Sequence, residues 1–525
     1  MLASPKTLTS AIYGNSGRLA ALTSLVLVLP IVEGCASTVE QDSSLSATCH
    51  NSGAKEQPIV LPAAHAVLEL SHDGVASQNA GGQTQTLPID LPTALRLANA
   101  QNPIIALARL RIDEAAAQFD QARVLLLPTL SAGGSYHKHE GRLQDVAGHV
   151  MEISRSSGYA GLGAGAVGAG SIVVPGVSVR SDLADAIFLP LAARQNSLAR
   201  EAESRVTQNS VSLAVTLAYF ELLRAKFDLA IAEESLTNAA ELARVTDEFS
   251  KAGEGLQSDA ERAAVERSLR ERDVEKSREA VQVRSAQLAE LLRLDLRTEL
   301  DPLDTAVIPV EFVRADRPLA ELLAASLQNR PELEQSRSLV QLACERLRHA
   351  EFGPLLPSVL LSASVGGFGG GTNSSLVNTS DRTDFDAMLF WELRNLGLGD
   401  KALTQERRSQ LEQAKLAEVA MMDRVASEVT QAHAQVTSRR KQIELARAAV
   451  KRAENSFQLN RTRIFEKQGL PIEVLQAIQS LATTRREYLS AVIEYNQAQF
   501  RLHTALGQSL AETTHESVDS TERQP

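Results

Sequence analysis

The sequence predicts a mainly helical protein that also contributes strands to a transmembrane β-barrel, and that is built from an internal duplication. Three observations predict this fold class. Two motifs occur twice in the same order, several segments alternate between apolar and polar residues, and long proline-free stretches carry a heptad repeat. Aromatic residues make up only 4% of the 525 residues, a composition that suits long and closely packed helices.

The duplication is visible in two proline-containing motifs. ALRLANAQNP ends at Pro103 and LLAASLQNRP ends at Pro331, 228 positions later. LLPTL and LLPSV follow, and their prolines, Pro128 and Pro357, are 229 positions apart. Because two landmarks keep their register across a whole half, we interpret the halves as repeats. Their expected bounds are residues 87–298 and 318–508.

The amino terminus has the pattern of an export signal. Two basic residues precede an apolar run at residues 19–32, and Cys35 follows a glycine shortly afterwards. This arrangement resembles a bacterial lipoprotein signal, in which the cysteine is lipidated; the alternative is an ordinary export signal that is cleaved nearby. We therefore expect a signal peptide at residues 1–34, a lipid on Cys35, and a flexible tether over residues 35–86, which are rich in Ser, Gln, Gly and Asn.

Segments with a period of two follow the LLP motif in each repeat, and they predict strands at about residues 129–189 and 358–391. Their length of about 9–11 residues is that of a tilted strand in a bilayer, although each segment alone could be a hairpin of a soluble domain. Loops are expected at residues 137–171 and 366–382. After the signal, no segment has the roughly 20 apolar residues of a spanning helix, so any membrane crossing falls to the strands.

Long helices follow the strands. The expected ranges are residues 191–252 and 257–294 in the first repeat, and 401–467 and 471–507 in the second. The helices are separated by turns at Gly253, Gly255, Gly469 and Pro471. The first helix carries apolar seams on two flanks, which indicates a neighbour on each side, as in a curved wall. Residues 299–317 are expected to form an irregular link, and residues 509–525 a disordered tail.

Composition and motifs argue against several other functions. The formal net charge of −11 disfavours a nucleic-acid partner, because phosphate binding requires a basic face. The three cysteines have no metal-ligand spacing. No phosphate-binding loop or catalytic triad is present in the sequence. We therefore expect no enzymatic activity, no cofactor and no metal site.

The assembled pattern resembles the TolC-like outer-membrane factor family, also called outer membrane efflux proteins, over about residues 87–508. Each half reads helix, two strands, long helix, turn and returning helix, with NP and LLP motifs ahead of the strands. The resemblance implies a homotrimer, in which each chain gives four strands to one twelve-stranded barrel and its helices to an α-barrel tunnel. The strand count independently requires an oligomer, dimer or trimer, because four strands leave open edges in lipid.

The resemblance also implies a function and partners. It points to a passive exit duct of a tripartite efflux or type I secretion system in the bacterial outer membrane. A periplasmic adaptor would connect the duct to an inner-membrane RND or ABC transporter, and drugs, metal ions or polypeptides could pass through it. The alternative is a periplasmic or surface coiled-coil scaffold without a pore.

A pore constriction is implied near the start of each returning helix. In the family an acidic V-D-V-L-D-A-like run lines the narrow end of the tunnel, and Ile472-Glu473-Val474-Leu475-Gln476-Ala477 matches it here. Glu473 keeps the first acidic position, whereas Gln476 replaces the second. The offset of 214 between the turns adds Asp259. Three copies of Glu473 would favour cations; the alternative is a solvated carboxylate in the first turn of a helix.

Overall fold

The computed structural model of the protein describes residues 86–130, 132–162, 177–466 and 468–510. The expected signal peptide, Cys35, and all of the expected tether except Thr86 lie outside these residues. Within the described residues, no helix is both long enough and apolar enough to span a membrane.

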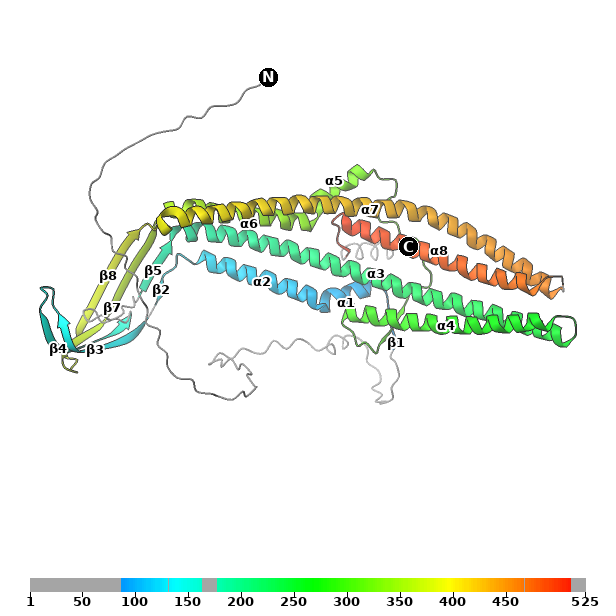
Figure 1. Cartoon of the computed structure of the whole chain (residues 1–525), viewed down its shortest axis with the longest axis horizontal. Helices are drawn as coiled ribbons and strands as arrows, with labels where there is room; N and C mark the ends of the chain where they lie inside the picture. Colours follow the sequence, from blue (N-terminus) through cyan, green and yellow to red (C-terminus); the bar gives the residue numbers. More distant parts are fainter. Residues whose placement is uncertain (1–85, 131, 163–176, 467, 511–525) are drawn as a thin grey trace, which may run out of the picture. The chain divides into compact units, whose positions relative to one another are not determined.

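The internal duplication is confirmed by four pairs of corresponding helices (Figure 1). The paired lengths are 11 and 11, 21 and 22, 69 and 68, and 36 and 35 residues. The pairs are α1 (Leu91–Gln101) with α5 (Leu319–Asn329), α2 (Pro103–Arg123) with α6 (Pro331–Phe352), α3 (Leu183–Lys251) with α7 (Leu398–Phe465), and α4 (Gln257–Leu292) with α8 (Pro471–Ala505).

Polar caps and prolines determine where several of these helices begin. Asn102 caps α2 by accepting a hydrogen bond from the Ile104 N–H, at 2.9 Å, and Pro103 occupies the first turn. Asp182 caps α3 by accepting a hydrogen bond from the Ala184 N–H, at 3.0 Å. The caps satisfy N–H groups that have no partner within the helix.

Helix α3 is about 100 Å long at 1.5 Å per residue, and it packs against helices on both flanks. Helices α2 and α6 accompany the part of α3 nearest the strands, and α4 and α8 accompany the rest (Figure 1). One predicted seam, including Val215 and Leu222, packs on Leu288 and Leu292 of α4. The other seam, including Phe220, packs on α8. The expectation of two neighbours is therefore confirmed.

The link between the repeats is more ordered than expected. Residues 299–317 were expected to be irregular, but β6 (Glu299–Pro302) pairs in parallel with β1 (Thr86–Ile89). Further along the link, two buried amides of α8, Asn496 and Gln499, bind extended backbone. Gln499 accepts a hydrogen bond from the Val313 N–H and donates one to its carbonyl, both at 3.0 Å. The side chains thus replace a neighbouring strand, which no local sequence pattern reveals.

Six antiparallel segments form one sheet. Their register places some of them end to end, so that the sheet is four strands wide, and we call each of these four rows a strand line. The segments are β2 (Thr129–Leu130), β3 (Ala132–Gln144), β4 (Val150–Leu162), β5 (Val177–Asp182), β7 (Ser358–Thr372) and β8 (Ser380–Phe390). β4 and β5 pair with successive parts of β7, where Leu162 lies opposite Val365 and Val177 lies opposite Ala363. β3 pairs with β4, and β2 with β5, on the other side. The lines are therefore β2/β3, β4/β5, β7 and β8, which confirms the predicted four.

The predicted loops in the sheet region were wrong in extent. Residues 137–144, 150–162, 366–372 and 380–382 are in strands, so the strand-free connection between β7 and β8 is only residues 373–379. Polar and glycine residues occupy this part of the sheet, and hydropathy therefore gives no alternation there. At Gly366 a Cβ would lie 2.5 Å from the Ala160 carbonyl oxygen, so the close pairing of β7 with β4 requires glycine.

The beginning of the first long helix was also predicted wrongly. A strand was expected to extend to residue 189 and the helix to begin at residue 191, yet β5 ends at Asp182 and α3 runs through Pro190. Proline removes one backbone hydrogen bond and disfavours a helix interior. The first turns of α3 are held by the Asp182 cap and by a hydrogen bond between Asp185 and His349 of α6, at 2.8 Å, which offsets that loss.

The two faces of the sheet differ in chemistry. Directly opposed residues of β7 and β8 share a face, and the pairs on one face are Val359 with Leu389, Leu361 with Ala387, and Ala363 with Phe385. On the other face, the Ser362 and Ser364 hydroxyls donate to Asp386 and Asp384, at 3.2 and 3.4 Å. The apolar face is open to solvent in the single chain, where Phe385 is 73% exposed and Leu389 is 55% exposed.

Candidate functional site at the helix tips

The helical hairpins of the two repeats end in glycine-containing turns that lie side by side (Figure 1). After α3, the N–H groups of Glu254 and Gly255 donate to the Phe249 carbonyl, at 2.9 and 3.0 Å, and Gly253 has a φ of +74°. A left-handed residue just past a helix end is the usual way to satisfy its last carbonyls, and glycine adopts that conformation without strain.

The second turn uses a similar closure. The Gly469 N–H donates to the Arg463 carbonyl at 3.1 Å, and a Cβ on Gly469 would lie 3.1 Å from the Ile464 nitrogen. Pro471 then starts α8. The four residues predicted for the turns, Gly253, Gly255, Gly469 and Pro471, thus lie at the tips of the hairpins.

A groove of about 240 Å³ lies between the two turns. Phe249, Leu256 and Asp259 line it from the first repeat, and Leu470 and Pro471 from the second. The predicted residue Asp259 is therefore brought next to the tip of the other hairpin. It lies in the first turn of α4, and its carboxylate is 3.7 Å from the guanidinium of Arg262.

Glu473 lies in the first turn of α8 and is not an isolated carboxylate. Its Oε2 is 3.2 Å from Nη1 of Arg463, in the last turn of α7, and the two side chains are 37% and 50% exposed. The ion pair therefore joins the two helices of one hairpin across the turn. Gln476 lies three residues further along α8 and is exposed.

Sequence reasoning missed Arg463 because it considered only the run that begins at Ile472. The spacing of the two residues in the sequence could have indicated this pair. Arg463 is ten residues before Glu473, and the turn between the helices brings the two positions together. An arginine beside the predicted acid changes the charge of the site, because the pair is neutral at pH 7.

Polar contacts connect the hairpins above the tips. Gln479 of α8 donates to Glu266 of α4 at 3.0 Å, and Glu266 also accepts from Arg270 at 2.5 Å. Six residues further along α8, Arg485 pairs with Glu234 of α3 and, at 3.0 Å, with Glu454 of α7. These side chains tie α8 to three neighbouring helices.

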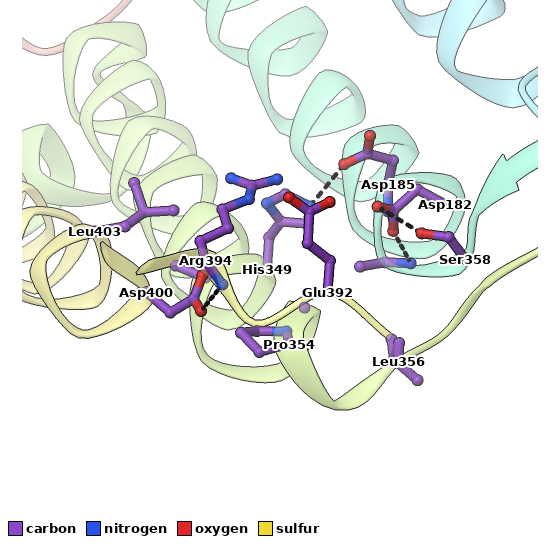
Figure 2. Close-up of a pocket in the computed structure, with 13 residues that line it drawn as sticks. Asp182, Asp185, His349, Pro354, Leu356, Ser358, Glu392, Arg394, Asp400 and Leu403 are labelled. Carbon is purple, nitrogen blue, oxygen red and sulfur yellow. Dashed lines mark hydrogen bonds and ion pairs between the residues drawn. The ribbon is translucent and has the colours of Figure 1, made fainter. Parts of the chain in front are cut away.

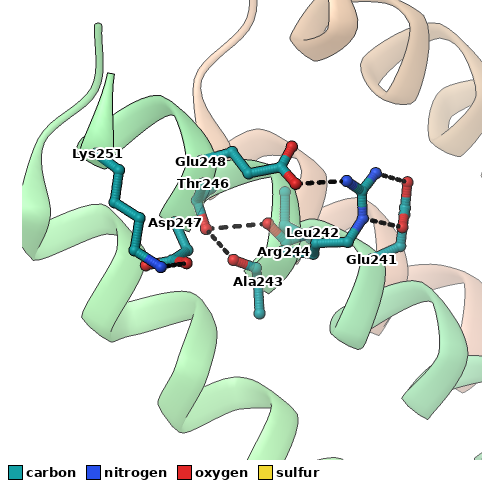
Figure 3. Close-up of polar contacts among 8 residues, drawn as sticks. All are labelled: Glu241, Leu242, Ala243, Arg244, Thr246, Asp247, Glu248 and Lys251. Atoms are coloured by element: carbon teal, nitrogen blue, oxygen red, sulfur yellow. Dashed lines mark hydrogen bonds and ion pairs between the residues drawn. The ribbon is translucent and has the colours of Figure 1, made fainter. Parts of the chain in front are cut away.

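Ion pairs along the last turns of α3 stiffen the first hairpin (Figure 3). Arg244 binds Glu241 at 2.9 Å and Glu248 at 2.8 Å, and Lys251 binds Asp247 at 2.6 Å. The hydrogen bond from Arg244 lowers the pKa of the Glu241 carboxyl. These are pairs three or four residues apart on the helix surface, a spacing at which opposite charges support a helix.

The described residues contain no group of three or more His, Cys, Asp or Glu side chains placed to hold a metal ion. The features at the tips are charged pairs, amide contacts and a shallow groove. The strands at the other end of α3 and α7 present an exposed apolar face.

Comparisons with known proteins agree with this architecture. Residues 322–508, which include most of α5 and all of α6, β7, β8, α7 and α8, match the family described as outer membrane efflux protein. No curated protein sequence matches the chain.

Solved structures share the fold over most of the chain. The outer membrane protein VceC of Vibrio cholerae is 17% identical, with a TM-score of 0.64, over 80% of this chain and 96% of that one. The CmeC outer membrane channel of Campylobacter jejuni is 16% identical, with a TM-score of 0.66, over 82% and 89%. The MtrE outer membrane channel of Neisseria gonorrhoeae is 19% identical, with a TM-score of 0.63, over 80% and 89%.

At identities this low, the solved structures establish the fold alone. The family match covers the second repeat. Residues 322–508 thus match the family of outer membrane efflux proteins, and over most of its length the chain has the fold of the TolC-like outer-membrane channels.

Proposed function

We propose that the protein is one subunit of a trimeric exit duct in the bacterial outer membrane. The duct passively conducts substrates that a tripartite pump or a type I secretion system delivers from the periplasmic side. The observation that carries this proposal is a four-line sheet with an exposed apolar face and two open edges, continuous with helical hairpins about 100 Å long.

The open edges support assembly with further copies. In the described part of the chain, no strand pairs with the outer side of β3 or of β8. Unpaired backbone groups are prohibitive in lipid, so a sheet that faces lipid must close. Pairing β8 of one copy with β3 of the next continues the antiparallel sheet, and three copies give twelve lines.

The chemistry of the two faces supports the orientation of the sheet. The face of Leu361, Phe385 and Leu389 is apolar and suits lipid, whereas the face of Ser362, Ser364 and Asp386 suits a water-filled interior. Such alternation along a strand is the pattern of a membrane barrel that encloses water.

The partners follow from the passive nature of the duct. A passive duct supplies no energy itself, so the proposed source of transport energy is an inner-membrane transporter of the RND or ABC class. A periplasmic adaptor is the proposed link to that transporter, and the hairpin tips are the proposed meeting point. A lipid on Cys35 would add a second attachment to the outer membrane.

The same tips would form the pore constriction in the trimer. Glu473, with Gln476 one turn further and Asp259 in the neighbouring hairpin, is the proposed lining. The pairs Arg463–Glu473 and Arg262–Asp259 make this lining a ring of alternating charges rather than a purely acidic one.

Native mass spectrometry of the detergent-purified protein tests the assembly. We expect three copies per particle and a heat-sensitive oligomer on a denaturing gel. A monomer that stays soluble without detergent would instead favour a coiled-coil scaffold.

A further inference from the structure

The connection between β8 and α7, residues 391–398, exposes a group of large apolar side chains. Trp391, Leu393, Leu396 and Leu398 are 60%, 63%, 90% and 72% exposed. Single exposed leucines are common on protein surfaces, whereas a contiguous apolar patch indicates a binding surface. We call this segment the 391–398 turn.

The backbone of the turn is left-handed over three residues. Asn395, Leu396 and Gly397 have φ values of 51°, 58° and 84°. Leucine is disfavoured in this region because its Cβ crowds the following carbonyl. The conformation is held where the Arg394 N–H donates to the Asp400 carboxylate, at 3.1 Å. The fold therefore fixes a strained leucine in the most exposed position of the turn.

Polar and apolar side chains of this region are segregated. Glu392, Arg394 and Asp400 line a small pocket of about 60 Å³ that also contains His349 and Asp185, and Figure 2 shows these polar groups gathered there. None of the four apolar side chains of the turn lines that pocket. The polar side chains of the turn thus gather at the pocket, whereas the four exposed apolar side chains lie outside it.

The apolar side continues the lipid-facing face of the sheet. Trp391 comes directly after the last residue of β8 and two residues after Leu389, which lies on the apolar face. On the facing 3-10 turn (Gly353–Leu355), Leu355 is 70% exposed and Pro354 lines the same pocket as Arg394. The apolar surface therefore extends past the end of β8 to the first turn of α7.

We propose that the 391–398 turn is an interfacial anchor that inserts Leu393, Leu396 and Leu398 into the lipid surface at the helical side of the outer membrane. Trp391 lies at the level of the headgroups, where its indole has both apolar and polar surroundings. The anchor fixes the height of the sheet in the bilayer. The inference rests on the proposed function, because it takes the apolar face of β8 as the lipid-facing one.

Lipid fits this surface better than a second copy of the chain. A second copy would pair with the backbone edge of β8, residues 380–390, which ends before the turn begins. The turn extends the apolar face of the sheet, and it does not extend the hydrogen-bonding edge of β8. Its leucines also project from an irregular backbone rather than from a strand, which suits a fluid partner.

The chain contains one tryptophan, which makes a fluorescence test direct. A W391F background receives one tryptophan at a time, as L396W in the turn, L389W on the sheet face, or L416W on α7. Leu416 is also well exposed, but it lies about 27 Å along α7 from Leu398. Each full-length variant is reconstituted into phosphatidylcholine vesicles with bromine at a shallow or a deep position of the acyl chain.

The expected result separates the three positions. Shallow bromines should remove about half or more of the L396W emission and deep bromines clearly less, because the turn lies at the interface. L389W should be quenched by both lipids, and L416W by neither.

Two results would overturn the inference, and they are distinguishable. If L389W is quenched and L396W is not, the sheet is in the membrane but the turn is not an anchor. Protection of L396W from aqueous iodide in that case would assign the turn to a contact between copies. If neither L389W nor L396W is quenched, the proposed function itself fails.

Discussion

The charge at the hairpin tips gives the sharpest prediction. Glu473 and Arg463 form an ion pair at 3.2 Å, so in the proposed trimer the constriction carries three neutral pairs. The variant R463Q leaves three unpaired carboxylates, and E473Q leaves three unpaired guanidinium groups. The two variants should therefore shift ion selectivity in opposite directions, toward cations for R463Q and toward anions for E473Q.

The size of the shift follows from electrostatics. A unit charge about 6 Å from a permeating ion contributes about 0.7 kcal/mol in water. Screening at 0.15 M salt, with a Debye length of about 8 Å, reduces this by about half, so three charges contribute about 1 kcal/mol. That energy corresponds to about a fivefold change in the local concentration of a monovalent ion. Stability should change by less than about 1 kcal/mol, because the pair is substantially exposed.

Reversal potentials in planar bilayers under a salt gradient measure this shift. The matched control is R314Q, which breaks an exposed ion pair with Asp316 in the link between the repeats and should leave the reversal potential unchanged. The reasoning requires opposite shifts for E473Q and R463Q. Unchanged reversal potentials in both would show that Glu473 is a solvated residue away from the pore.

Three further predictions follow from other parts of the chain. C35S should still assemble in the outer membrane, because acylation adds only about 0.8 kcal/mol per buried methylene beside a closed barrel, and mass spectrometry of the wild-type amino terminus checks the lipid; an unmodified terminus elsewhere would eliminate the anchor. L222D should abolish trimers on a gel, because Leu222 is fully buried and an unpaired buried carboxylate costs several kcal/mol. The control variant A230D, on the exposed side of α3, should still assemble, and equal trimer yields for the two variants would mean that the seam is misassigned. Burial lowers the pKa of His503 below 6.5, so the folded state binds fewer protons than the unfolded state and loses stability as the pH falls below about 6.5; H503Q should reduce this loss in melting temperature between about pH 7.5 and 5.5, and an unchanged pH dependence would contradict it.

The matched control for L222D could not be chosen from sequence alone. Arg224 is two residues away and has the charge of a surface residue, but it lies 3.5 Å from Glu221 and 3.9 Å from Glu494. An aspartate there would add a third carboxylate to that group, so the variant would not be neutral. Ala230 carries no such contacts.

Local chemistry made much of the fold predictable. Prolines and glycines mark helix ends because their backbone restrictions act within a few residues, so the starts of α4 and α8 agree with the sequence. The heptad seams predicted which flanks of α3 are buried. Alternation identified β7 and β8 where one side is apolar, as at Leu361 and Phe385.

The features that were missed depend on distant residues. Residues 137–144 of β3 and their partners 150–157 of β4 have polar residues on both faces of the sheet, so no periodicity distinguishes strand from loop there. The parallel pair of β1 and β6 joins segments more than 200 residues apart, and Gln499 binds Val313 across 186 residues. At the candidate site, Glu473 was found from a local run, whereas Arg463 needed the turn that folds α8 back on α7.

Single-channel recording of the purified oligomer in a planar bilayer tests the central claim most directly. A duct predicts discrete steps of ion current that persist without any nucleotide, adaptor or transporter. A purified trimer that inserts into the bilayer and leaves it electrically sealed, with no current under any voltage, would contradict the account.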